Sequence, residues 1–146
     1  MGYRSQVRVI TSKKGYDELS QYVTQAAREF ETPDYDYNLI KIADAIKSND
    51  DQSQVMLCWD SVKWYEGYYK DVDIIMGGLK MLKDKGYSYT FSRIGEDYDD
   101  IEEIHNEGTI ENEVDWAWID RYFDDGGLGF YEDSLLQGDL EDEEDE

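Results

Sequence analysis

The segment YSYTFSRI, Tyr87–Ile94, alternates aromatic and small polar residues almost throughout its length. This alternation predicts a strand with one buried face, because successive side chains of a strand point to opposite faces. Before this segment, apolar residues recur at helical spacing after Asp71, which can cap a helix that Gly86 would end. After it, Asp100–His105 is expected to pair back on the strand across the acidic turn Gly95–Asp99.

The N-terminal part of the chain contributes a second set of elements. Tyr3–Thr11 is rich in β-branched residues and predicts an opening strand. Apolar residues then occupy one helical face from Ser12, a candidate cap, as far as Phe30. Pro33 ends this helix, since the residue before a proline is driven towards an extended conformation. A second, shorter helix is expected at Tyr37–Ser48.

The remaining segments complete an α+β pattern. Gln54–Trp59 and Val62–Glu66 predict strand material, either one long bulged strand or a tight hairpin, and a short helix is expected near Glu113–Phe123. This order predicts a mainly antiparallel sheet with helices packed on one face and ferredoxin-like elements. We expect a single domain over residues 1–136, followed by an acidic disordered tail over residues 137–146.

The charge of the chain is concentrated in its last third. Its 146 residues suffice for one domain with its own core, and the formal net charge is −22. Residues 1–93 hold 13 bases and 14 acids, whereas residues 94–146 hold 22 acids and one base, Arg121. A device for general solubility would be spread over the whole chain. The asymmetry therefore indicates a surface for interaction, and it disfavours direct binding of nucleic acid phosphates.

Eleven acids are the candidate partner-binding residues, because apolar residues at structural spacing lie among them and place them on a folded surface. They are Glu96, Asp97, Asp99, Asp100, Glu102, Glu103, Glu107, Glu111, Glu113, Asp115 and Asp120.

Tyrosines and tryptophans are frequent near this acidic part, and two interpretations stay open: recognition surface, or amphipathic core and rim of a small sheet. The residues concerned are Tyr65, Tyr68, Tyr69, Tyr87, Tyr89, Tyr98, Tyr122, Tyr131, Trp116 and Trp118.

The sequence offers no catalytic, cofactor or metal motif. Cys58 is the single cysteine of the sequence, which excludes a disulfide framework and a cysteine-based zinc site. It lies in an apolar run and is expected in the core. His105 is interpreted as a surface histidine, and no nucleophile elbow accompanies it. No phosphate-binding glycine loop is present. No apolar run approaches the roughly 18 residues of a membrane span and no signal-peptide core is found, so a cytoplasmic protein is expected.

Three stretches resemble a family of small, mostly uncharacterised bacteriophage and prophage proteins. They are Gly2-Tyr3-Arg4-Ser5-x-Val7, Val62-Lys63-Trp64-Tyr65, and Phe91-x-Arg93-Ile94-Gly95-Glu96-x-x-Asp99-Asp100-Ile101-Glu102-Glu103. They occur in the family's order and cover about a fifth of the chain. The chain departs from the family pattern from Glu107 onward. The resemblance implies phage origin and expression in a bacterial cytoplasm, and it implies no activity and no catalytic residues.

Three functions remain as hypotheses. The first is a DNA-mimic inhibitor whose acids occupy a basic, nucleic-acid-binding surface of a bacterial host or defence protein. The second is an accessory phage binding module in which acidity serves solubility. The third is an enzyme or nucleotide binder that uses the carboxylates of Asp97–Glu103, with a divalent ion.

Overall fold

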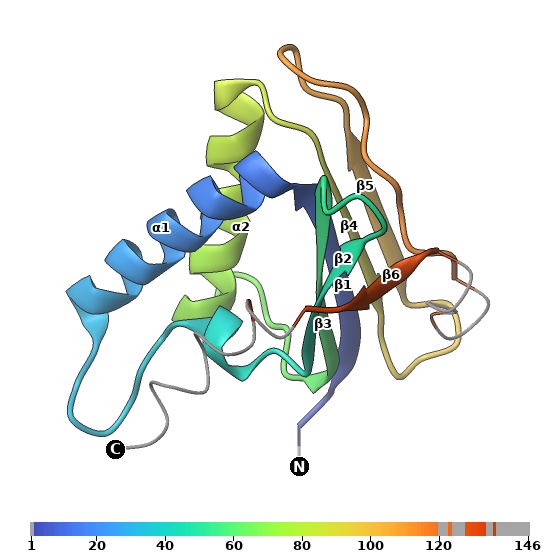
Figure 1. The fold of residues 1–146 in the computed structure, drawn as a ribbon. Helices are drawn as coiled ribbons and strands as arrows, with labels where there is room; N and C mark the ends of the chain where they lie inside the picture. Colours follow the sequence, from blue (N-terminus) through green and yellow to red (C-terminus); the bar gives the residue numbers. More distant parts are fainter. Residues whose placement is uncertain (1, 120–122, 124–127, 134–135, 137–146) are drawn as a thin grey trace.

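A computed structural model describes residues 2–119, 123, 128–133 and 136 of the chain (Figure 1). The strands in this part are β1 (Ser5–Ser12), β2 (Ala45–Asn49), β3 (Gln54–Val62), β4 (Tyr89–Ile94), β5 (Ile101–Asn106) and β6 (Phe130–Glu132). The helices are α1 (Lys13–Phe30), α2 (Lys70–Lys85) and a short 3-10 helix, η1 (Leu39–Ile42). Among these described helices, none has the length and apolar character needed to cross a membrane.

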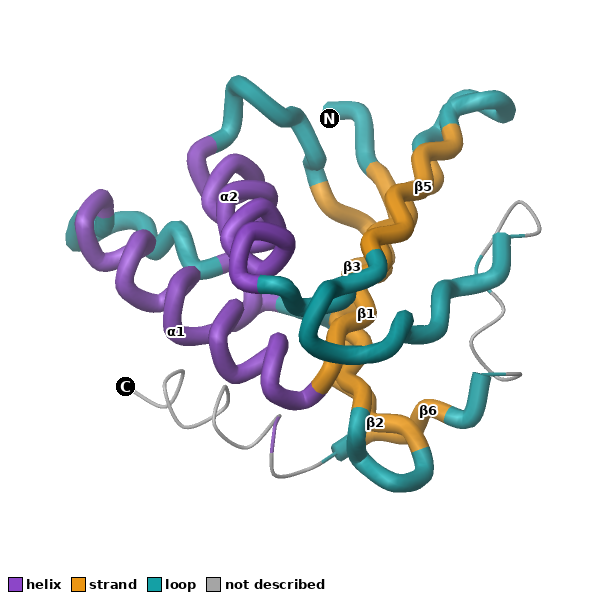
Figure 2. Tube along the Cα trace, turned by 90° about the horizontal axis from the view of Figure 1, so that it is seen from above, coloured by secondary structure: helices purple, strands orange, loops and turns teal. Residues whose placement is uncertain are grey.

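The six strands form one antiparallel sheet in the order β5-β4-β1-β3-β2-β6. The chain order β1-α1-β2-β3-α2-β4, with these four strands side by side as β4-β1-β3-β2, is the ferredoxin-like arrangement. β5 and β6 add one strand at each edge. α1 and α2 lie next to each other on one face of the sheet (Figures 1 and 2). The predicted α+β fold, with helices on one face, is confirmed.

Local signals place both helices. The hydroxyl of Ser12 accepts a hydrogen bond from the N–H of Gly15 at 2.9 Å, which caps the first turn of α1. Gly86 ends α2 in the left-handed conformation, with φ of 93°, where glycine is favoured. These two boundaries are those expected. Asp71 does not have the capping role expected for it: it lies in the first turn of α2, two positions after the N-cap Tyr69, which makes no side-chain hydrogen bond.

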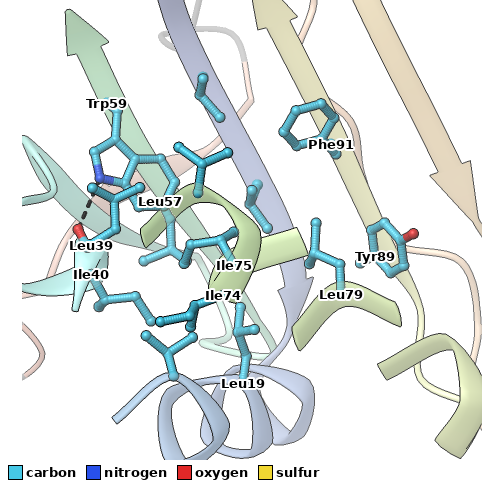
Figure 3. Packing of buried hydrophobic residues seen from close by; sticks show 14 of the residues in the cluster. Leu19, Leu39, Ile40, Leu57, Trp59, Ile74, Ile75, Leu79, Tyr89 and Phe91 are labelled. Atoms are coloured by element: carbon cyan, nitrogen blue, oxygen red, sulfur yellow. Dashed lines mark hydrogen bonds between the residues drawn. The ribbon is translucent and has the colours of Figure 1, made fainter. Parts of the chain in front are cut away.

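The main core lies between the helices and the sheet (Figure 3). Alternate residues of β1, β3 and β4 point towards the apolar stripes of α1 and α2. Its fully buried members include Val9, Leu19, Leu57, Trp59, Ile75, Leu79 and Phe91. The indole N–H of Trp59 donates to the carbonyl of Leu39 at 3.0 Å, so its one polar atom is satisfied. Each such large side chain contributes about 1.5–3 kcal/mol by burial.

The opposite face of the sheet is covered by the chain that follows β5, which is orange in Figure 1. Two clusters fill this second layer: Ile10, Ala45, Met56, Cys58, Val114 and Phe130 in one, and Ile94, Ala117 and Phe123 in the other. Cys58 is only 2% exposed, as expected for a core residue. The sheet therefore has no fully solvated face, and part of the acidic third contributes to the fold.

The prediction of a helix near Glu113–Phe123 is wrong: the described residues of that range form no helix. The N–H of Asp115 donates to Oε1 of Gln54 at 2.9 Å, and its carbonyl accepts from the hydroxyl of Thr90 at 2.7 Å. Side chains of the sheet thus satisfy backbone groups that a helix would satisfy internally. Val114 and Ala117 are buried against the sheet, which holds the segment in this irregular conformation.

The helix expected at Tyr37–Ser48 is also wrong. Only the single turn η1 forms, capped by the side chain of Asn38, which accepts from the N–H of Ile40 at 3.0 Å. The following residues form β2, whose Ile46 pairs with Leu57 of β3. The spacing of apolar residues in so short a run is compatible with a helix or with a strand. The strand forms because β3 presents an edge with which residues 45–48 can pair.

The middle of the chain forms a single strand rather than a hairpin, but this strand is shorter than the long bulged strand expected. β3 runs without a turn to Val62, with a shift of register opposite Ser5 and Val7. Residues 63–66 lie beyond it, so the strand expected at Val62–Glu66 does not form. β6 was not expected from the sequence. The expected disordered tail, residues 137–146, lies outside the described residues.

Candidate functional site

Ten of the eleven candidate acids lie in the described part of the chain, and Asp120 does not. Four of them, Glu96, Asp97, Asp99 and Asp100, lie in the turn between β4 and β5. Glu102 and Glu103 lie on β5, and Glu107, Glu111, Glu113 and Asp115 follow it. The hairpin β4-β5 that carries them forms as expected, with Arg93 opposite Glu102 and Ser92 opposite Glu103.

Two of these acids are bound by Arg93. Its guanidinium donates to both carboxylate oxygens of Asp100, at 2.7 and 3.1 Å, to Oε1 of Glu102 at 3.1 Å, and to the hydroxyl of Ser5 at 3.1 Å. Desolvation opposes the charged form of Arg93, but the hydrogen bonds to Asp100 and Glu102 prevail and raise its pKa. Asp100 and Glu102 therefore stabilise the hairpin, and Arg93 compensates one of their two negative charges.

Two further acids are bound to the backbone of neighbouring segments. A carboxylate oxygen of Glu96 accepts from the N–H of Arg4 at 2.6 Å, and one of Glu111 accepts from the N–H of Ser88 at 2.6 Å. Tyr3 joins the turn from the other side, since its hydroxyl donates to Asp100 at 2.7 Å. The contacts of Tyr3 and Arg4 attach the acidic turn to the residues that precede β1, and the contact of Glu111 attaches the segment after β5 to the residue just before β4. Glu96 and Glu111 therefore have structural roles.

The alternation of β5 separates the acids between the two faces of the sheet. Ile104 packs with the main core on the helix side, and Glu102 lies on that same side. Ile101, Glu103 and His105 lie on the opposite side, where the segment after β5 crosses. The neighbouring carboxylates Glu102 and Glu103 therefore point to opposite faces of the sheet.

The exposed acids of the second side lie beside exposed aromatic rings. Trp116 and Trp118 are 42% and 53% exposed, although they flank the buried Ala117. The ring of Trp116 lies 5.3 Å from that of His105. We call this the acidic-aromatic surface and define it by Ile101, Glu103, His105, Glu113, Asp115, Trp116 and Trp118.

A shallow hollow of about 440 Å³ occupies part of the acidic-aromatic surface. It is lined by Ile101, Glu103, Trp116, Ala117, Trp118 and Ile119. In the described part of the chain, Glu103, Glu113 and Asp115 make no ion pair. This surface therefore combines uncompensated carboxylates with apolar area that a partner can cover.

Sequence reasoning did not assign Ile101 and His105 to the candidate surface. The signal was available, because the period of two along β5 places both residues on the side of Glu103. No pattern in the sequence predicts that Trp116 and Trp118 lie beside β5, because their positions depend on how the chain after β5 crosses the sheet.

A carboxylate-based metal site gains no support. Over residues 2–119 and the other described positions, no group of three or more His, Cys, Asp or Glu is arranged to hold a metal ion. Asp100, the last residue of the turn, has both carboxylate oxygens hydrogen-bonded to Arg93.

Comparison of the chain with protein-family models, with curated proteins and with solved structures found no match.

Proposed function

We propose that this chain is an acidic interaction protein that acts as a DNA-mimic inhibitor by binding a basic, nucleic-acid-binding surface of another protein. The observation that supports this most strongly is the acidic-aromatic surface. There Glu103 lines a hollow together with two exposed tryptophans, and Asp115 directly precedes Trp116 in the chain. Neither acid has an ion-pair partner among the described residues. Surfaces that bind DNA are rich in Lys and Arg, because duplex DNA presents one charge per roughly 1.7 Å of axis. Uncompensated carboxylates present the same negative charge as DNA phosphates, and they can therefore attract the Lys and Arg side chains of such a surface.

The tryptophans supply what charge alone lacks. Trp is enriched among the residues that dominate binding energy, and an arginine guanidinium stacks well on its ring. Carboxylates would steer the partner from a distance, and this contribution is screened over about 8 Å at physiological ionic strength. Contacts of Trp116 and Trp118 act at short range and resist salt. Binding should therefore weaken steeply with salt but retain a residual component.

The phage origin that the sequence resemblance implies gives this proposal its setting. The partner would be a host or defence protein that handles nucleic acid, in the bacterial cytoplasm. An accessory binding module, in which acidity serves solubility, is the second candidate, and the experiment below separates the two.

The test uses the full chain as bait in a nuclease-treated bacterial lysate, at low and high salt, with duplex DNA as competitor. A captured protein is then purified and its affinity measured directly. We expect that the double variant Glu103→Gln, Asp115→Asn weakens binding about tenfold or more, in the range of a buried charged contact. Trp116→Ala should weaken it similarly and remove the salt-resistant component.

The matched control is the double variant Asp17→Asn, Asp84→Asn, which removes the same charge from exposed positions on α1 and α2. It should leave affinity within about twofold, since both acids lie on the helices, outside the acidic-aromatic surface, and their exposed ion pairs with Lys13 and Lys80 contribute little. Equal loss from both double variants would mean that bulk charge, not this surface, drives binding. A partner that duplex DNA does not displace would favour the accessory-module alternative.

A further inference from the structure

A second hollow lies on the helix side of the sheet, away from the acidic-aromatic surface. It has a volume of about 480 Å³, within the usual range of ligand sites, and is lined by Tyr35, Tyr37, Tyr68, Tyr69, Lys70 and Asp71. Its walls come from two loops that are far apart in the sequence: one follows α1 and the other leads into α2. We call it the tyrosine hollow.

Aromatic rings form most of the tyrosine hollow. Tyr35 and Tyr37 pack edge to face with ring centres 4.5 Å apart, and Tyr69 packs similarly on Tyr65 at 5.0 Å. These rings are not core residues, since Tyr35 is 48% exposed, Tyr69 37% and Tyr68 87%. Several large aromatic side chains thus remain open to solvent at one place, where a bound group can contact their faces.

A carboxylate lies at the base of this hollow and joins its two loops. Asp71 is only 7% exposed, and one of its oxygens accepts from the hydroxyl of Tyr35 at 2.8 Å. The other oxygen accepts from the N–H of Val72 at 2.8 Å. Desolvation, followed by this hydrogen bond to Asp71, raises the pKa of Tyr35 to about 12. Tyr35 therefore stays neutral and keeps donating at physiological pH.

The carboxylate of Asp71 and the tyrosine rings of the hollow together favour a cation as the ligand. Aromatic faces carry negative partial charge, and the buried carboxylate adds to it. Nearby, Asp73 accepts from the N–H of Gly67 at 2.8 Å and lies in the same first turn of α2. The one lysine of the lining has its ammonium 4.0 Å from the ring centre of Phe30, so Lys70 already makes a cation–π contact outside the tyrosine rings.

We propose that the tyrosine hollow binds a methylated ammonium group, as found in choline or in a methylated lysine side chain. Methylation is favoured because tyrosine rings make up most of the lining, whereas Asp71 is its one carboxylate and each oxygen of that carboxylate already accepts one hydrogen bond. A bare ammonium or a guanidinium would lose water and find few acceptors in return. A trimethylammonium group needs no acceptor, and its methyl groups can contact the tyrosine faces.

The test titrates the full chain with choline and, separately, with a peptide that contains trimethyllysine, followed by calorimetry and by backbone amide NMR. Two reference compounds separate the contributions of methylation and charge. Ethanolamine keeps the positive charge but lacks the three methyl groups, and 3,3-dimethylbutan-1-ol keeps the size and shape of choline but is neutral. We expect choline to bind at least about tenfold more tightly than either reference, as a cation–π site predicts. Amide shifts should be confined to the loops around Tyr35 and Tyr69.

Variants locate the site. Tyr69→Leu keeps apolar bulk but removes the ring, and it should weaken choline binding about tenfold. Tyr131→Leu, which alters a tyrosine of β6 that is 63% exposed, should leave binding unchanged. Thermal unfolding of each variant reports whether it is folded. If the trimethyllysine peptide binds more tightly than choline, the natural ligand is a methylated side chain of a protein partner. If choline binds more tightly, the natural ligand is a small molecule. Equal binding of the neutral analogue, or no saturable binding of either ligand to the folded chain, would overturn the proposal.

Discussion

Replacing Arg93 by Gln tests whether Asp100 and Glu102 are structural acids rather than binding residues. The substitution keeps a polar side chain, but it shortens that side chain, leaves two of the five N–H donors and removes the positive charge that both carboxylates share. Arg93 has a side chain only 16% exposed, whereas the two carboxylates are 30% and 37% exposed. A hydrogen bond to a charged group contributes about 1.5–3 kcal/mol when protected from water. The partial exposure of both acids lowers this, so we expect a loss of about 3 kcal/mol in all.

The expected loss corresponds to a fall in Tm of roughly 6–12 °C for a chain of this size. Urea denaturation at low and at high salt measures it. The loss should be smaller at high salt, because screening reduces the repulsion left between the two carboxylates. Lys80→Gln is the matched control. It breaks the ion pair with Asp84, whose side chains are 77% and 63% exposed, and should cost less than about 0.5 kcal/mol.

A double-mutant cycle with Asp100→Asn completes the design. The coupling free energy between positions 93 and 100 should exceed about 1 kcal/mol, because the two groups share a bidentate contact. A stability change for Arg93→Gln no larger than that of the lysine control, or a coupling near zero, would refute the assignment. Asp100 and Glu102 would then return to the set of candidate binding acids.

Three further predictions concern the fold and the tyrosine hollow. Gly86→Ala should destabilise by more than Gly67→Ala in thermal unfolding. Both glycines have positive φ, 93° and 85°, but a Cβ at Gly86 would lie 2.6 Å from the Thr109 hydroxyl, whereas one at Gly67 meets nothing within 4 Å. Ser12→Ala should cost about 1 kcal/mol in urea denaturation, because the first turn of α1 loses its cap. The pKa of Tyr35 is raised in the folded state from 10.0 to about 12, so its stabilising contribution is complete below pH 10 and is lost as pH rises towards 12. The stability difference between the wild type and Tyr35→Phe should therefore shrink over that interval, and absorbance titration should show one late tyrosine fewer in the variant.

Periodicity in the sequence was sufficient to predict those strands and helices in which the pattern of apolar residues extends over many consecutive residues. The alternation of Tyr87–Ile94 predicted β4, and the apolar stripe between Ser12 and Phe30 predicted α1. Both patterns extend over enough residues to distinguish a period of two from one of 3.6. The asymmetric charge of the chain was equally plain, because net charge is a sum over residues and needs no fold.

Contacts between distant residues decided the rest. Residues 45–49 became a strand because β3 presents an edge to pair with, and residues 113–119 stayed irregular because Gln54 and Thr90 hydrogen bond their backbone. The compensation of Asp100 by Arg93 and the meeting of Tyr35 with Asp71 likewise join residues that no local pattern relates. Composition and periodicity describe each segment alone, whereas a surface or a hollow depends on which segments the folded chain brings together.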